Sequence, residues 1–200
     1  MGPCLLGVGL DRLPSVGKVF DHIDESLAAW LRAQPVFFVA TAPLAADGLL
    51  NCSPKGLQGT FAVLDDHRVG YLDLTGSGVE TIAHLRDNGR IVLMFCAFDG
   101  RPRIVRLHGR GKVVLPDDER FDALLPRFSD HPGVRSVIVV DVARIADSCG
   151  YAVPRLDYVE DRDILDLSAA KKGPEKLAAY RRERNEVSLD GLPALSSGSP

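Results

Sequence analysis

Short apolar runs separated by turn residues fill the middle of the chain, and they predict β-strands. Runs rich in β-branched and aromatic residues and bounded by Gly, Asp or Asn are typical of strands. The turn Ala46-Asp-Gly48 is typical of a hairpin. The longest run contains Gly109 and Gly111, which predicts a bend or bulge. The predicted strands span residues 36–41, 49–53, 60–64, 69–74, 90–97, 103–115 and 134–142.

Apolar residues at helical spacing predict fewer helices. Ile23 and Leu27 share a face of the first helix, which Asp21 is expected to cap. Asn88-Gly89 is typical of a helix end. The run Arg181-Arg-Glu-Arg184 interleaves charges and is interpreted as a solvated helical face. The predicted helices span residues 22–33, 79–88, 116–128, 161–172 and 174–185.

These elements predict a mainly β fold with flanking helices. Six or seven strands joined by short turns favour a barrel over a doubly wound sheet. The chain has 200 residues, enough for one well-packed domain. We expect that domain at residues 16–145, a coil and helical C-terminal extension at 146–195 and a disordered tail at 196–200. Residues 1–15 are expected to be extra or disordered, with the natural start at Val16.

Charge and hydropathy exclude several classes of function. The formal net charge is −3, which gives no sign of a nucleic-acid-binding surface. The longest apolar stretch, residues 35–46, is too short to span a bilayer. The start of the chain has no basic region of the kind that opens a signal peptide. We therefore expect a protein without a membrane or nucleic-acid partner.

Four cysteines are scattered along the chain at Cys4, Cys52, Cys96 and Cys149. None forms a C-x-x-C pair, so a structural zinc site is not expected and no metal is predicted. Few and scattered thiols are typical of a reducing cytoplasm. Because Cys52 and Cys96 lie inside predicted strands, we expect both thiols to be buried and inert.

Two short segments carry groups that could hold an anion. Ser53-Pro-Lys-Gly56 offers a hydroxyl and an ammonium at a strand end. Thr75-Gly-Ser-Gly78 precedes a helix, where unpaired N–H groups and the helix dipole favour negative charge. Thr75, Ser77 and Thr81 add hydroxyl donors. The alternatives are a plain turn with an exposed lysine and an N-capped loop without a ligand.

Arginine and histidine residues provide further candidates. Arg103 and Arg106 begin the long strand and could contact a phosphate or carboxylate, or could simply protect a sheet edge with charge. His84 and His108 could act as acid or base, since histidine titrates near neutrality. The alternative is that each histidine is a packing or surface residue, because no carboxylate or serine adjacent in the sequence indicates a catalytic triad.

The order of these pieces resembles the pyridoxamine 5′-phosphate oxidase-like, FMN-binding split-barrel family. The resemblance covers residues 16–142 and is strongest from Pro35 to Val114. It implies a six-stranded split β-barrel that forms a homodimer, with FMN in clefts between the subunits. Asp73 and Leu74 would line the flavin through backbone groups. The full set of cofactor-binding residues that the resemblance implies is Ser53, Lys55, Asp73, Leu74, Thr75, Ser77, Thr81, Arg103 and Arg106.

The sequence departs from true pyridoxamine phosphate oxidases at two places. Those enzymes carry a Ser-Arg-Lys run at the helix start, where this chain has Gly78-Val-Glu-Thr81. Glu80 stands near the place of an expected cation, and an acid there repels a phosphate. The arginine-rich substrate-binding motif at the end of the oxidases is also absent. The resemblance therefore points to a different branch of the family, with another substrate.

The function that follows is a cytoplasmic, homodimeric, FMN-dependent oxidoreductase acting on a small molecule. The substrate would enter the cleft between subunits and be covered by the tail around residues 151–158. One alternative keeps the fold and uses a deazaflavin as a dissociable cosubstrate. Another is a non-catalytic flavin- or small-molecule-binding dimer. Haem binding is not expected, because the tail lacks an obvious axial histidine.

Overall fold

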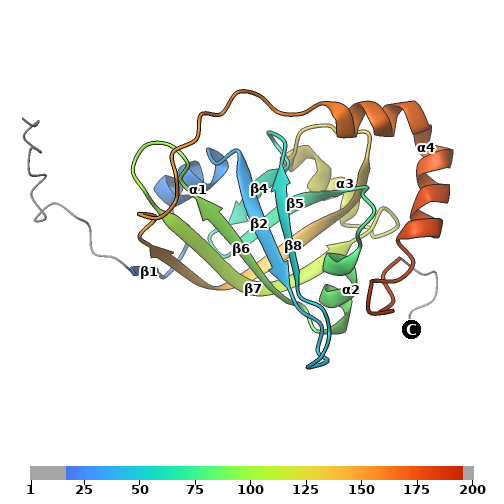
Figure 1. Ribbon diagram of the computed structural model, residues 1–200, viewed down its shortest axis with the longest axis horizontal. Coiled ribbons are helices and arrows are strands. Elements are labelled where there is room, and N and C mark those ends of the chain that lie inside the picture. The colour runs from blue at the N-terminus through green and yellow to red at the C-terminus, as the bar shows by residue number, and fades with distance from the viewer. Residues whose placement is uncertain (1–16, 196–200) are drawn as a thin grey trace, which may run out of the picture.

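A computed structural model describes residues 17–195 of the chain. The expectations for residues 1–15, for a start at Val16 and for a disordered tail at 196–200 lie outside this range. Residues 17–195 form eight β-strands in one antiparallel sheet of order β3-β2-β6-β7-β8-β5-β4, with β1 added to β8 (Figure 1). The strands are β1 (Val19–Phe20), β2 (Val36–Thr41), β3 (Asn51–Gly56), β4 (Phe61–Asp65), β5 (Arg68–Leu74), β6 (Arg90–Cys96), β7 (Ile104–Val114) and β8 (Val134–Ser148).

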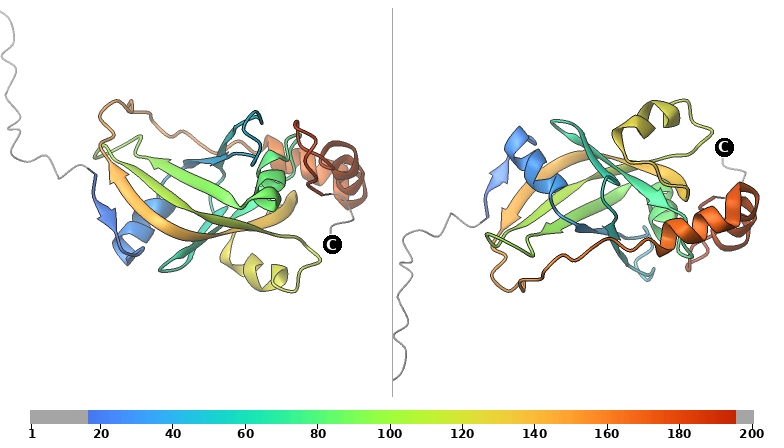
Figure 2. Two further views of the ribbon diagram at one scale, coloured as in Figure 1. Left: turned by 90° about the horizontal axis from the view of Figure 1, so that it is seen from below. Right: turned by 90° about the horizontal axis from the view of Figure 1, so that it is seen from above.

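The expected count of six strands was too low. The pattern located seven of the eight strands, but β1 has only two residues, too few to show alternation. It pairs with the far end of β8, where Val19 faces Ala146. Strand β8 also continues to Ser148, six residues beyond the predicted end. The extra length lets β8 pair with β1 and with the start of β7, while its first half pairs with β5, and the sheet curls around it (Figure 2).

The predicted bend in the long strand β7 is confirmed. The register between β7 and β8 shifts between His108 and Gly109. A Cβ atom on Gly109 would lie 2.2 Å from the carbonyl oxygen of Asp141, so no larger residue fits there without a shift. On Gly111 a Cβ would lie 2.7 Å from Cδ2 of Leu85. The two glycines let β7 bend around β8 and bring the helix that carries Leu85 against the sheet.

The helices are α1 (Glu25–Arg32), α2 (Glu80–Asp87), α3 (Phe121–Leu124), the 3₁₀ turn η2 (Leu125–Arg127) and α4 (Ile164–Arg184). The cap of α1 is Asp24 rather than the predicted Asp21, and its carboxylate accepts the N–H of Leu27 at 2.7 Å. The predicted helix at 116–128 is cut to α3 and η2. Pro126, which has no N–H to continue α-helical bonding, lies in that turn.

The C-terminal region consists of a coil followed by α4, as expected. We call residues 149–163 the strap, because they cross from the end of β8 to α4 (Figures 1 and 2). Helix α4 is broken at Gly173, which has a φ of 69° and precedes Pro174. This break separates the two predicted helices, 161–172 and 174–185. Only Ala169 and Leu177 of α4 are buried, so the helix has little apolar contact with the barrel.

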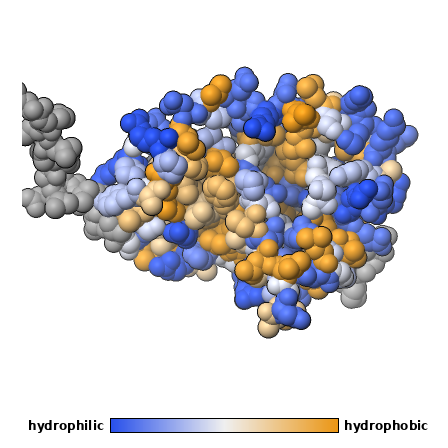
Figure 3. Space-filling view, in the orientation of Figure 1, coloured by the Kyte–Doolittle hydropathy of each residue, from blue (hydrophilic) through white to orange (hydrophobic). Residues whose placement is uncertain are grey.

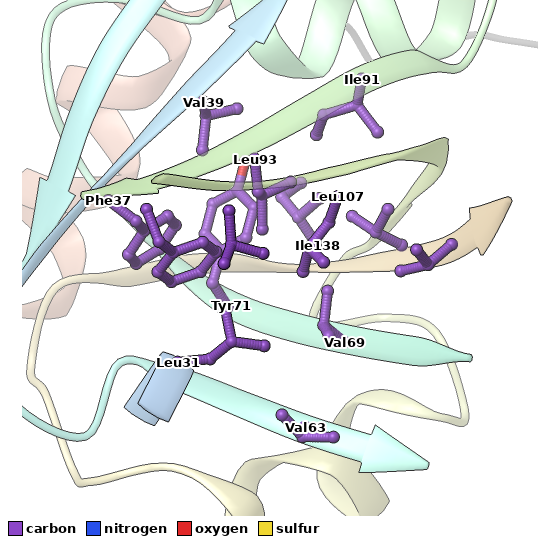
Figure 4. Close-up of a cluster of buried hydrophobic side chains, with 14 of the residues drawn as sticks. Leu31, Phe37, Val39, Val63, Val69, Tyr71, Ile91, Leu93, Leu107 and Ile138 are labelled. Carbon is purple, nitrogen blue, oxygen red and sulfur yellow. The ribbon is translucent and has the colours of Figure 1, made fainter. Parts of the chain in front are cut away.

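The core fills the inside of the curled sheet (Figure 4). Val39, Leu93 and Ile138 are among its buried side chains and come from three different strands. An aromatic cluster lies at one end, where Phe37 is 5.5 Å from Tyr71 and 5.2 Å from Phe95 between ring centroids. Such close packing of side chains from separate strands gives the strand ends fixed positions.

Candidate functional site

A buried carboxylate joins three strands at one end of the sheet. Asp73 on β5 is fully buried and accepts a hydrogen bond from Arg135 Nε on β8 at 2.8 Å. The Lys55 ammonium at the end of β3 lies 3.5 Å from the other carboxylate oxygen. Ser136 Oγ donates a weaker bond at 3.3 Å. The structure therefore brings Lys55 and Asp73, both predicted site residues, into one ion cluster.

The charges of this cluster set the protonation state of Asp73. Burial alone would raise the pKa of its carboxyl, but the nearby Arg135 and Lys55 charges and the hydrogen bonds from Arg135 and Ser136 outweigh it. The pKa of Asp73 is therefore held below its ordinary value, and the carboxylate is ionised at neutral pH. Arg181 brings a further cation, whose pKa is lowered by burial and by repulsion from Arg135.

The loop Thr75–Gly78 is held by the C-terminal helix. Arg181 Nε donates to Thr75 Oγ1 at 2.9 Å. The Asn185 amide, one residue past α4, donates to the carbonyls of Gly76 and Ser77 at 3.0 and 3.3 Å. Arg135 donates to the carbonyl of Gly78 at 3.0 Å and to Asn185 Oδ1 at 2.8 Å. The loop's carbonyls are thus bound to side chains of β8 and the C-terminal region.

Three of the four N–H groups of this loop are left available, because only Thr75 uses its N–H, which donates to the Gly133 carbonyl at 2.8 Å. Within residues 17–195, the backbone N–H groups of Gly76, Ser77 and Gly78 make no hydrogen bond. Helix α2 follows directly, and its N-cap residue Val79 provides no side-chain cap. Free N–H groups at an uncapped helix start are suited to an anion. Glu80 opposes this, because its carboxylate lies 2.7 Å from where a Cβ on Gly78 would be.

A second polar network links β3 to α2. Ser53 Oγ donates to Asn51 Oδ1 at 2.8 Å. The Asn51 amide donates to Thr81 Oγ1 at 3.0 Å and to Thr41 Oγ1 at 3.1 Å. Thr41 Oγ1 in turn lies 2.9 Å from His84 Nδ1. The predicted residues Ser53 and Thr81 therefore meet through Asn51, to which the sequence had assigned no role.

Alternation along β3 explains this arrangement. Asn51, Ser53 and Lys55 share the partly buried face, and Cys52 is exposed on the other. The expectation of a buried Cys52 thiol was wrong, because β3 is an edge strand with one open face. Cys96 on the interior strand β6 is buried, and burial raises the pKa of its thiol.

Arg103 and Arg106 do not reach the loop within one chain. Arg103 pairs with Asp147 at 3.4 Å, and its guanidinium lies 4.9 Å from the ring centroid of Trp30. Arg106 donates to Ser148 Oγ at 3.0 Å. Both partners belong to the last residues of β8, whereas Leu74, next to the loop, pairs with Val134 at its beginning. The two arginines thus lie toward the opposite end of this strand.

Neither candidate histidine stands beside a partner for acid–base chemistry. His84 is fully buried, and burial lowers its pKa although Asp190, Glu80 and Asp87 partly offset this. Its Nε2 atom has no hydrogen-bond partner among residues 17–195. His108 is exposed, and partial burial and the charges of Arg144 and Arg106 lower its pKa. His84 is therefore a packing residue.

Sequence reasoning missed Arg135, Arg181 and Asn185. Arg181 had been interpreted as part of a solvated face, yet it donates to Thr75 and to the Val134 carbonyl at 2.8 Å. The only signal for Arg135 was an arginine at the start of a strand otherwise rich in valine. Across residues 17–195 there is no cluster of potential metal ligands and no helix long and apolar enough to cross a membrane.

Comparisons with known proteins agree on one family. A family model described as "Pyridoxamine 5′-phosphate oxidase" matches residues 23–149. A curated relative, "Pyridoxamine 5′-phosphate oxidase family protein ustO" of Aspergillus flavus, is 38% identical over 194 residues, which cover 89% of this chain and 78% of the relative.

Solved structures give weaker likenesses. HupZ of Group A Streptococcus is 23% identical with a TM-score of 0.47, covering 62% of this chain and 91% of that one. An FMN-binding protein of Syntrophomonas wolfei is 15% identical with a TM-score of 0.45, covering 69% and 91%.

Proposed function

This chain belongs to the pyridoxamine 5′-phosphate oxidase family, and from that premise we propose that it binds FMN as the cofactor of an oxidoreductase. The bound flavin would supply hydride or electron transfer. The observation that carries the proposal is the loop Thr75–Gly78, whose carbonyls are bound by Arg135 and Asn185 while the N–H groups of its last three residues stay available. These donors fit the phosphate of FMN.

The chain's own residues have separate roles in this proposal. Lys55, Ser77 and Thr81 would donate to the phosphate or to the polar edge of the cofactor, and Ser53 would do so by giving up its hydrogen bond to Asn51. Thr75, whose N–H and hydroxyl both donate to the Gly133 carbonyl, would position the loop. Leu74 would contact the flavin through its backbone. The Asp73 carboxylate would hold Lys55 in place, since the two groups already lie 3.5 Å apart. Asp73 therefore acts through its buried side chain as well as through the backbone role expected from the family.

The charge at the loop supports an anionic ligand despite Glu80. Lys55, Arg135 and Arg181 contribute three cations near the loop, against the carboxylates of Asp73 and Glu80. One positive charge thus remains in excess. Arg135 and Arg181 would supply the positive potential that the Ser-Arg-Lys run supplies in the oxidases, without replacing its residues one for one.

A homodimer is part of the proposal. Arg103 and Arg106 lie toward the end of β8 that is remote from the loop of their own chain, as shown by their partners Asp147 and Ser148. If these arginines contact the cofactor, they do so across a subunit boundary. A cleft between two copies would then contain Lys55 of one subunit and Arg103 of the other.

Deazaflavin as a dissociable cosubstrate is the second candidate, and Glu80 favours it. A carboxylate beside the loop weakens the hold on a phosphate, which suits a ligand that must leave after each turnover. The same fold and the same strand ends would serve this function, with the flavin analogue exchanging between proteins.

The first experiment is a visible absorption spectrum of the purified protein, repeated after FMN is added and the excess removed by gel filtration. A flavin spectrum that remains with the protein supports an FMN-binding protein. Turnover with an electron donor would then support the oxidoreductase, and its absence with every donor would favour a binding dimer. A colourless protein that retains deazaflavin but not FMN would overturn the proposal.

A further inference from the structure

A cavity of about 840 Å³ adjoins the candidate cofactor site. It lies between the end of α1, the β3–β4 turn, the β6–β7 loop and the strap. Lys55 on β3 lies next to it, because the following residue of the strand, Gly56, lines the cavity. Phe37, the register partner of Lys55 on β2, lines it as well. Its volume is within the range of about 300–1,000 Å³ that is usual for small-molecule sites.

The walls of the cavity are rich in aromatic rings. Its aromatic lining residues are Trp30, Phe37, Phe61, Phe98 and Tyr158. Phe37 and Phe61 lie 5.5 Å apart between ring centroids. Phe61 is also 5.0 Å from the buried ring of Phe95, so the rear wall is a fixed aromatic layer. Such a surface favours a flat ring system, which can stack or meet the rings edge-on.

Most of the charged groups at the rim already have partners. Asp99 accepts a hydrogen bond from Arg155 at 2.9 Å. Asp161 accepts the backbone N–H of Gln58 at 2.7 Å. Arg32 pairs with Glu25 at 3.3 Å. The two other charged lining residues, Arg101 and Asp157, have opposite signs, so the rim as a whole does not select a fully charged ligand and suits a neutral molecule.

The strap forms one wall and is fastened at both ends of the cavity. The Leu156 N–H donates to the Phe98 carbonyl at 2.9 Å, and Asp161 holds the β3–β4 turn through Gln58. Between these points the strap offers Leu156 and Tyr158 to the cavity, although both side chains are more than half exposed. Figure 3 shows apolar residues gathered on this face of the molecule. A partly wetted apolar wall leaves surface for a ligand to cover.

The β3–β4 turn contains a strained residue that faces the same cavity. Leu57 has a φ of 70°, a conformation that residues other than glycine rarely adopt. Thr60 holds the turn, since its hydroxyl donates to the carbonyls of Gly56 and Leu57, both at 2.8 Å. Strained residues gather at binding sites.

We propose that this cavity is the substrate site and that it takes a neutral, planar, aromatic molecule. Its role as a substrate site rests on the proposed flavin function, because the cavity adjoins Lys55. Binding of such a molecule does not depend on the flavin. The sequence predicts only that the tail around residues 151–158 covers the substrate. In the structure this part of the strap places Leu156 and Tyr158 in the cavity wall.

Trp30 is the only tryptophan in the chain, so its fluorescence reports events in this cavity directly. Coumarin, which is neutral and planar, serves as the probe. It should quench Trp30 emission to saturation at one molecule per chain. Tyr158→Ala should weaken coumarin binding about tenfold, since an aromatic wall is lost. Tyr151→Ala is the matched control, because Tyr151 is a strap tyrosine of similar exposure that does not line the cavity.

Leu57→Gly provides a second variant, since glycine accepts the positive φ without strain and the change removes the leucine side chain from the cavity wall. It should keep the thermal midpoint and still weaken coumarin binding. FMN retention is measured on every variant and should not change. A protein that binds coumarin but does not retain FMN would contradict the proposed flavin function and leave the cavity proposal standing. Three results would overturn the cavity proposal. The first is quenching that does not saturate, and the second is an equal effect of Tyr158→Ala and Tyr151→Ala on coumarin binding. The third is a dimer that dissociates with Tyr158→Ala while coumarin never binds.

Discussion

At the scale of single residues, the buried carboxylate of Asp73 is the centre of the site. We expect Asp73→Asn to lower the free energy of unfolding by about 3 kcal/mol, because Arg135 would keep a buried charge without its partner. Asp65→Asn is the control, since Asp65 pairs with Arg68 at the surface and should contribute at most about 1 kcal/mol. Urea denaturation measures both. Equally small losses of unfolding free energy for the two variants would contradict a buried ion pair between Asp73 and Arg135.

Lys55 is predicted to distinguish FMN from riboflavin, which lacks the phosphate. Lys55→Met should raise the dissociation constant of FMN about tenfold, through loss of one charge-assisted contact, and leave that of riboflavin unchanged. Lys112→Met removes an exposed lysine that pairs with Asp141 and should change neither constant. Flavin fluorescence titrations give the constants. A parallel loss for both flavins would place Lys55 elsewhere on the cofactor.

His84 should make the fold sensitive to mild acid. Its pKa in the fold lies below the ordinary value of 6.5, because burial disfavours the charged ring. As the pH falls, the unfolded chain therefore takes up the proton on His84 before the folded chain does. The contribution of His84 to the free energy of unfolding is complete above pH 6.5 and is lost as the pH falls below it. His84→Gln should reduce the difference in unfolding free energy between pH 7.5 and pH 5. An undiminished difference would assign it to other groups, such as His108.

At the scale of elements, the bulge in β7 depends on a glycine. Gly109→Ala should lower stability by about 2 kcal/mol, since its Cβ would meet the Asp141 carbonyl oxygen at 2.2 Å. Gly76→Ala is the control for stability, because a Cβ there has no atom within 4 Å. Thermal unfolding by circular dichroism compares them. Equal midpoints would mean that β8 can shift to accept the methyl group.

The elements were largely predictable because they depend on local signals. The bend at Gly109 and the break between the two halves of α4 follow from glycine and proline, whose effects act on their own backbone. The ion cluster was not predictable in the same way. Asn185 binds the carbonyl of Gly76 across 109 residues of sequence. The sequence of α4 gives no sign of the contact of Arg181 with the loop either, because the exposed Arg182 and Arg184 beside it are the same residue type.

At the scale of the whole molecule, the proposed dimer can be tested by mixing two defective variants. If each site takes Lys55 from one subunit and Arg103 from the other, Lys55→Met and Arg103→Met dimers should each retain FMN poorly. Exchange of subunits would then create mixed dimers with one intact site, restoring about a quarter of all sites. Retained flavin is counted by absorbance. No recovery, with subunit exchange shown by mass, would place both residues in the same subunit's site.

The contact between α4 and the loop has a consequence for how this protein could be lost in a cell. The eight strands of residues 17–195 all end by Ser148, so a chain cut in the strap keeps the whole sheet but loses Ala194, which is buried in its core. The groups that fix the loop, Arg181 and Asn185, come more than 100 residues after it. An early stop codon in the strap would therefore remove the groups that hold the loop and, with Ala194, part of the core packing.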